Sequence, residues 1–269
     1  MWALAEPWRP GTRPLLADTP ARLLVALACV VTVSVLLASR SPLASGALRV
    51  VGVAAGHGAL LATALAWAGC GPGSGVIAIV LLAAAAAAAT AGPAGALAYL
   101  SVPLWIAWLA RGRRLAALGL AGPVSRRALL AAVALGAFLG GHLLVSASLT
   151  LGVRVRPERV AGILAGLAYD VGANVLAAEC FFRGALFNRA QRRWSFVAGL
   201  VLATAAYVAR YLVDPLRPTS VEWLVGATFY LTLLSAGNCW LFWWSGSLVP
   251  GVVGAVIFFT AYRLLGTGP

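Results

Sequence analysis

Long apolar runs separated by short polar segments dominate the hydrophobic pattern of the chain. Most runs have about 20 residues, the length that an α-helix needs to cross the hydrocarbon core of a bilayer. The third and fourth runs are shorter and are joined only by Gly92-Pro93, so they form either a tight hairpin or one broken, re-entrant element. The pattern therefore predicts an all-α, polytopic membrane helix bundle with about eight or nine transmembrane helices. The runs cover residues 22–38, 48–69, 76–91, 94–110, 128–151, 160–187, 195–213, 221–244 and 248–265.

Composition supports the same class of protein. The 269 residues are 62% hydrophobic and 10% charged, with a mean hydropathy of +0.93, which excludes an ordinary soluble domain. The formal net charge is +13, and all 20 basic residues are arginines. Because these arginines gather between the apolar runs, we expect membrane lipids around the protein and no nucleic acid as a partner. The four cysteines have no paired spacing, so we expect no metal and no other cofactor.

The arginines also predict an orientation in the membrane. Two arginine-rich loops lie two runs apart and therefore fall on the same side of the bilayer. Because positively charged loops stay in the cytoplasm, we place both loops and the N-terminus there, and nine spans then leave the C-terminus outside. Residues 1–20 show no cleavable signal peptide and are expected to form a cytoplasmic tail. The loops carry Arg111, Arg113, Arg114, Arg126 and Arg127, and Arg189, Arg192 and Arg193.

A carboxylate and a guanidinium lie one helical turn apart inside the run 160–187. Glu179 is ten residues before Arg189, which corresponds to about 15 Å along a helix and places it near the middle of the bilayer. Arg183 shares its helix face and can pair with it. Because a charge at this depth is costly, the pair is either a structural ion pair or a site whose carboxylate is held ionised to activate water.

Further polar side chains lie in the same run. Asp170 and Asn174 are also one turn apart, but on an unbroken helix they face away from Glu179. They could converge with it only if the helix breaks, for example at Gly172. We therefore expect Asp170 to belong to a packing polar pair or to a solvated interface.

Other polar residues are spread over different runs. His57 and His142 each lie next to glycine and are interpreted either as packed interhelical side chains or as bases brought close by folding. Arg210 lies near the end of the run 195–213, and Asp214 is a neighbour that could pair with it.

The segment Glu179-Cys-Phe-Phe-Arg183-Gly-Ala-Leu-Phe187, followed by Arg192-Arg193-Trp194, resembles the first motif of the CPBP family. This family contains CAAX proteases and bacteriocin-processing membrane proteins, also called Abi proteins. The segment Ser245-Gly-Ser-Leu-Val-Pro-Gly251 resembles the start of the last motif helix of that family. The resemblance implies a CPBP/Abi-like transmembrane core at 160–265, preceded by the tail at 1–20 and by N-terminal transmembrane helices at 21–151. It also implies a multi-pass protein of the bacterial cytoplasmic (inner) membrane.

The resemblance further implies an intramembrane glutamic endopeptidase, in which a glutamate assisted by histidines activates water and a His/Asn pair holds the oxyanion. Glu179 matches the second motif glutamate and Arg183 matches the supporting arginine. The remaining motif positions hold other residue types, which cannot perform the same chemistry. They are Ala178 at the first glutamate, Tyr211 and Gly254 at the two histidines, and Phe258 at the asparagine; a shift by one residue places Arg210 at the first histidine.

Three hypotheses follow from these departures. The first is a CAAX-protease-like membrane protein with reduced or lost proteolysis that binds a peptide or a membrane protein. The second is an active endopeptidase in which Glu179 activates water and Tyr211, Arg210 or His142 replaces the missing groups. The third is a small transporter or lipid-binding membrane protein.

Overall fold

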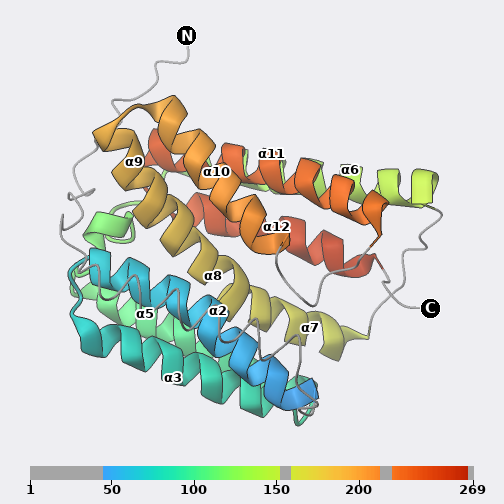
Figure 1. Cartoon of the computed structure of the whole chain (residues 1–269), viewed down its shortest axis with the longest axis horizontal. Helices are drawn as coiled ribbons and strands as arrows, with labels where there is room; N and C mark the ends of the chain where they lie inside the picture. Colours follow the sequence, from blue (N-terminus) through green and yellow to red (C-terminus); the bar gives the residue numbers. More distant parts are fainter. Residues whose placement is uncertain (1–44, 152–158, 213–219, 266–269) are drawn as a thin grey trace.

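The computed structural model describes residues 45–151, 159–212 and 220–265, and this part of the chain is helical without strands (Figure 1). Five of its helices are long and apolar enough to cross a membrane, and three shorter apolar helices accompany them. The prediction of a polytopic helix bundle is therefore confirmed. The predicted run 22–38 and the predicted tail 1–20 lie outside the described residues.

The helices of the first half follow the predicted runs closely. They are α2 (Ser45–Trp67), α3 (Pro72–Ala89), α4 (Pro93–Ala96), η1 (Leu97–Leu100), α5 (Ser101–Arg111), the short η2 (Ala116–Leu118) and α6 (Arg126–Leu151).

The third and fourth predicted runs form a hairpin. Gly92, with a φ of 128°, turns the chain after α3, and Pro93 begins α4 at a helix position that needs no N–H donor. The segments α4, η1 and α5 continue one another, and each of them packs against α3. The turn is tight, because a methyl group at Gly95 would overlap the carbonyl group of Ala88.

One long helix, called the central helix below, begins the second half and forms the centre of the molecule. It consists of α7 (Val160–Tyr169), η3 (Asp170–Asn174), α8 (Val175–Ala178), η4 (Glu179–Phe187) and α9 (Asn188–Arg193). Both η3 and η4 are π-helical, so their turns are wider than those of an α-helix. Figure 1 shows this helix crossing between α2, α3 and α5 on one side and the later helices on the other.

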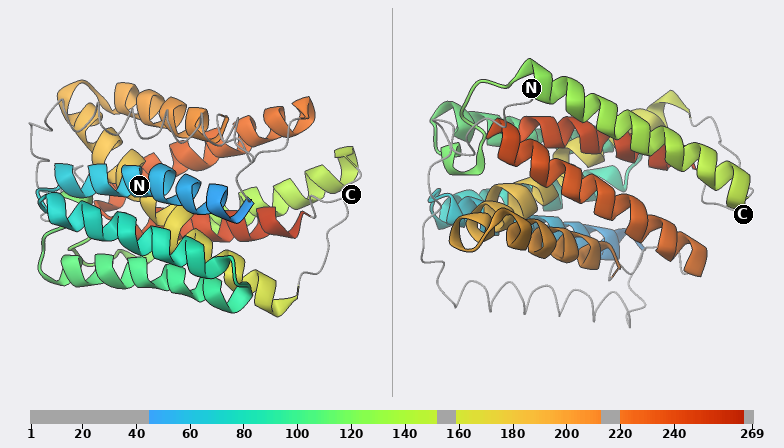
Figure 2. Two further views of the ribbon diagram at one scale, coloured as in Figure 1. Left: turned by 60° about the horizontal axis from the view of Figure 1, so that its bottom comes forward. Right: turned by 90° about the horizontal axis from the view of Figure 1, so that it is seen from above.

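Three helices complete the bundle, namely α10 (Phe196–Leu212), α11 (Val221–Ser245) and α12 (Val249–Leu264). The side chain of Ser220 caps α11 by accepting a hydrogen bond from the Trp223 N–H, and Gly246 ends this helix in a left-handed conformation with a φ of 66°. The helices α6, α11 and α12 pack against one another on the side of the bundle opposite to α2 and α3 (Figure 2).

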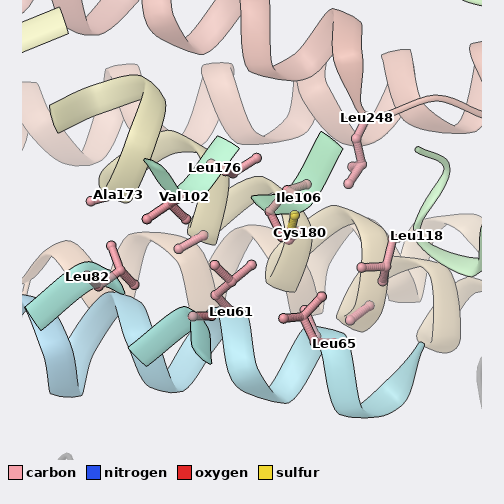
Figure 3. Packing of buried hydrophobic residues seen from close by; sticks show 14 of the residues in the cluster. Leu61, Leu65, Leu82, Val102, Ile106, Leu118, Ala173, Leu176, Cys180 and Leu248 are labelled. Carbon is pink, nitrogen blue, oxygen red and sulfur yellow. The ribbon is translucent and has the colours of Figure 1, made fainter. Parts of the chain in front are cut away.

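The central helix separates two hydrophobic cores. On one face, Leu176 and Cys180 pack with side chains of α2, α3 and α5, among them Leu61, Leu82 and Ile106 (Figure 3). On the other face, the buried residues belong to a second core with α6, α10, α11 and α12. The second core includes Val175, Ala178, Phe182, Tyr207, Leu234 and Phe258.

The arginine-rich loops lie at the same end of the bundle, as the sequence predicts. The Asn188 side chain donates a hydrogen bond of 2.9 Å to the carbonyl group of Ala117, which connects α9 to the loop after α5. The Leu248 N–H donates to the carbonyl group of Gly119, which brings the start of α12 to the same place. At this end the guanidinium of Arg189 also lies over the ring of Trp67, at the end of α2, with 5.1 Å between the Arg189 Cζ and the ring centre.

Two glycines allow α6 and α12 to touch through their backbones. A Cβ atom at Gly136 of α6 would overlap the Gly254 carbonyl oxygen, and one at Gly254 would lie 2.9 Å from the carbonyl oxygen of Ala132. Small residues at such a crossing are typical of membrane helices, which gain contact by close approach of their backbones.

We expect the substitution Gly136→Ala to lower the free energy of unfolding by about 1–3 kcal/mol, because the added methyl group must push α6 away from α12. The matched control is Gly141→Ala on the exposed face of the same helix, where the methyl group meets no atom within 4 Å. This control should be neutral or stabilising by up to about 1 kcal/mol. Denaturant titration of both variants in detergent micelles, followed by circular dichroism, measures the difference; equal effects would contradict the crossing.

Candidate functional site

Glu179 and Arg183 form an ion pair in the interior of the bundle. Glu179 Oε1 lies 3.3 Å from Arg183 Nη1, and the two side chains are only 1% and 0% exposed. Both residues belong to the π-helical η4, and their spacing of four residues places them on one face. The pairing expected from their spacing is therefore present.

Asn238 of α11 also binds this carboxylate. Its Nδ2 donates a hydrogen bond of 2.9 Å to Glu179 Oε1 and one of 3.2 Å to the Gly251 carbonyl oxygen. The amide thus joins η4, α11 and α12. We did not predict this role from the sequence, although a buried amide within the apolar run 221–244 is itself a signal of an interhelical hydrogen bond.

The carboxylate is closely enclosed. A Cβ atom at Gly251 would lie 2.8 Å from Glu179 Oε2, so only glycine lets the α12 backbone approach this oxygen without a shift. On the other side, the Arg183 guanidinium stacks over the ring of Tyr207, with 4.1 Å between its Cζ and the ring centre. Within the described part of the chain, Glu179 Oε2 and Asn238 Oδ1 make no hydrogen bond.

The structure does not bring the proposed replacement groups to Glu179. The Tyr211 hydroxyl donates a hydrogen bond of 2.9 Å to Asn174 Oδ1, and Arg210 Nη2 lies 2.8 Å from His57 Nδ1. His142 Nδ1 lies 2.7 Å from the hydroxyl of Tyr230.

The other motif positions have packing roles. Ala178 and Phe258 are buried in the second core, and Gly254 lies at the crossing of α6 and α12. None of the three offers a side chain that can donate a proton or hold an oxyanion.

A second polar cluster surrounds Asp170. Its carboxylate receives two hydrogen bonds from Arg263, of 2.6 Å and 2.9 Å, and a third of 3.2 Å from Asn174 Nδ2. The wide turn η3 lies here, where we considered a break in the helix, but Asp170 and Glu179 bind different arginines. Asp170 is therefore the buried member of a polar pair, and its partner Arg263, which is 33% exposed, is one that we did not predict.

Arg210 lies beside this cluster. Apart from its contact with His57, it donates through Nη1 to Asn174 Oδ1 at 3.4 Å, and its Cζ lies 4.7 Å from the centre of the Tyr211 ring. The suggested neighbour Asp214 lies outside the described residues. Within the described residues, Arg210 therefore contacts neutral groups and no carboxylate.

A cavity of about 660 Å³ opens at the end of the bundle opposite to the arginine-rich loops. It is bounded by the C-terminal parts of α6, α10 and α12 and by the N-terminal half of α11. Its polar wall contains Asp170, Asn174, Arg210, Tyr211 and Arg263, whereas neither Glu179 nor Arg183 lines it. The charged pair of the motif and the accessible space are thus separate features.

The described residues contain no cluster of three or more His, Cys, Asp or Glu side chains that could hold a metal ion. In sum, the arrangement around Glu179 can stabilise a buried charge pair, and the arrangement around Arg210 can bind a group that enters the cavity.

Comparison with known proteins identifies one family whose model matches the helices that carry these residues. Residues 159–258 match the family model described as type II CAAX prenyl endopeptidase Rce1-like. No curated protein and no solved structure matched the chain. The match runs from the start of α7 into α12 and contains every motif position discussed above, and it confirms the resemblance to CAAX proteases. The chain is therefore an integral membrane protein with a CAAX-protease-like, Rce1-like region at residues 159–258.

Proposed function

We propose that this protein is a non-proteolytic, Rce1-like membrane protein that acts by binding a partner. The observation that carries the proposal is the closed environment of Glu179. Its carboxylate is enclosed by Arg183, Asn238 and Gly251, while the cavity lies elsewhere. A carboxylate that activates water needs access to substrate and a second group that transfers the proton.

The identity of the neighbouring residues supports the same conclusion. The Arg183 guanidinium pairs with the carboxylate, so Glu179 Oε1 is already engaged in an ion pair and in the hydrogen bond from Asn238. Asn238 donates a hydrogen bond to the carboxylate but cannot accept and pass on a proton as histidine does. The Glu179–Arg183 pair then serves to join helices, and the cavity is the place where a partner binds.

The family resemblance suggests a peptide or a membrane protein as this partner. A membrane lipid is the alternative. A peptide needs hydrogen-bond partners in the wall of the cavity, whereas the alkyl chain of a lipid needs apolar surface. The cytoplasmic position of the arginine-rich loops and a bacterial inner membrane are parts of the same proposal.

Absence of proteolysis can be tested directly with the full chain reconstituted in vesicles. We expect no cleavage of a prenylated peptide with a CAAX terminus above the level seen with the double variant Glu179→Gln/Arg183→Met. Mass spectrometry of the peptide products is the measurement, with an Rce1-like enzyme that has an intact motif as the positive control. Cleavage that disappears in the double variant would overturn the proposal.

A structural role of the ion pair predicts a specific pattern of stabilities. Glu179→Gln should lower the free energy of unfolding by about 3–5 kcal/mol, because it leaves the buried Arg183 charge uncompensated. The double variant Glu179→Gln/Arg183→Met removes both charges and should recover most of this loss. Glu222→Gln, at an exposed position in the first turn of α11, is the control and should cost less than about 1 kcal/mol.

Denaturant titration in micelles measures all three variants. A single variant as stable as the wild-type protein, or a double variant no better than the single one, would exclude the structural role. Thermal unfolding of the same samples gives an independent check.

A further inference from the structure

The wall of the cavity carries a positive charge that the described protein does not balance. Arg263 is neutralised by Asp170, which it binds through two hydrogen bonds. Arg210 contacts only neutral acceptors and an aromatic ring in the described part of the chain. A cation inside a membrane protein is costly unless an anion pairs with it.

Glu222, the other carboxylate of the cavity wall, lies on a different part of the wall from Arg210. It is exposed in the first turn of α11, whereas Arg210 lies beside Asn174 and Tyr211 of the inner polar wall. In this position Glu222 contributes to the end of a helix, where an acidic residue is favourable.

Apart from this polar wall, the cavity is predominantly apolar. The lining from α11 and α12 includes Trp223, Leu224, Leu231, Phe258 and Phe259. The hydroxyl of Thr150, another lining residue, already donates to the Ser146 carbonyl oxygen at 2.6 Å. A volume of about 660 Å³ is within the range of pockets that enclose small organic ligands.

We propose that the cavity binds a single-chain lipid anion of the fatty-acid type, with its carboxylate at Arg210 and its alkyl chain along the apolar wall of α11 and α12. This inference rests on the proposed function, in which the cavity and not Glu179 is the working site. The positive charge of Arg210 selects an anionic head group, and the apolar lining selects an alkyl chain.

A lipid fits this wall better than a peptide does. Each peptide unit brings an N–H and a C=O group, and these groups lose free energy in apolar surroundings when they have no hydrogen-bond partner. The α11 and α12 side chains named above offer almost no such partners. An alkyl chain has no polar groups along its length and needs only the apolar surface.

The test uses the full chain in phosphatidylcholine vesicles, which carry no net charge, and radiolabelled palmitate as the probe. We expect saturable binding of palmitate and binding at least about tenfold weaker for palmitate methyl ester, which keeps the chain but loses the charge. Arg210→Gln should weaken palmitate binding by a similar factor and abolish the preference over the ester. Arg126→Gln, at an exposed position at the other end of the bundle, is the control and should bind as the wild type does.

A second variant tests the place of the alkyl chain without altering Arg210. Gly226 lines the cavity, and a Cβ atom there would meet no atom within 4 Å, so Gly226→Leu can fill the space without a backbone clash. It should weaken palmitate binding at least about tenfold. Gly141→Leu, on an exposed face of α6 outside the cavity, is the matched control.

Equal binding of palmitate and its ester, or unchanged binding by Gly226→Leu, would overturn the proposal even if Arg210→Gln fails to fold. A competition experiment distinguishes a failure of the lipid inference from a failure of the proposed function. If a short apolar peptide with a free terminal carboxylate binds through Arg210 and palmitate does not, the lipid inference fails while the cavity remains the working site. Cleavage of the prenylated peptide that depends on Glu179 would instead refute the proposed function itself.

Discussion

A charge pair deep inside an apolar helix bundle must find its compensation within the protein, and the packing of this molecule is arranged around one such pair. Glu179 and Arg183 lie on the central helix of the bundle. Asn238 of α11 binds the carboxylate, Gly251 of α12 lets it approach the backbone, and Tyr207 of α10 covers the guanidinium. The pair therefore restricts which residues three other helices can carry at their points of contact. In a bundle without strong hydrophobic driving force between helices, such polar contacts help to set how the helices meet.

The two π-helical segments explain why polar groups gather at two depths along one helix. Asp170 begins η3 and Glu179 begins η4, and each carboxylate binds an arginine. A wide turn changes the direction of the side chains that follow it, so both carboxylates can point into the protein. The rings of Tyr207 and Tyr211, 5.1 Å apart, lie between the two clusters. The Glu179–Arg183 cluster is buried, whereas the cluster around Asp170 borders the cavity.

Local features of this molecule could be predicted from the sequence, and contacts between distant helices could not. The apolar runs predict the helices, and the spacing of four residues predicts the Glu179–Arg183 pair, because both depend on neighbours along the chain. Asn238, Arg263 and His57 bind residues that are 59, 93 and 153 positions away. Such partners depend on which helix faces meet. In a membrane helix the face toward lipid is as apolar as the face toward the protein, so the hydrophobic pattern does not indicate which side is buried.

Gly254 matters both for the packing of α6 against α12 and for the proposed function. The resemblance places a motif histidine at this position, but here the α12 backbone lies against the Ala132 carbonyl group of α6. Any side chain at residue 254 would have to displace α6, because the atom that it meets belongs to the backbone and cannot rotate away. The glycine at this motif position and the close crossing of α6 and α12 therefore depend on each other. A histidine placed at residue 254 would disturb this helix contact before it could supply a base. Tyr211, which is bound to Asn174, could not supply that base beside Glu179. This coupling is one more argument for the proposal that the cavity beside Arg210, and not Glu179, is the working site.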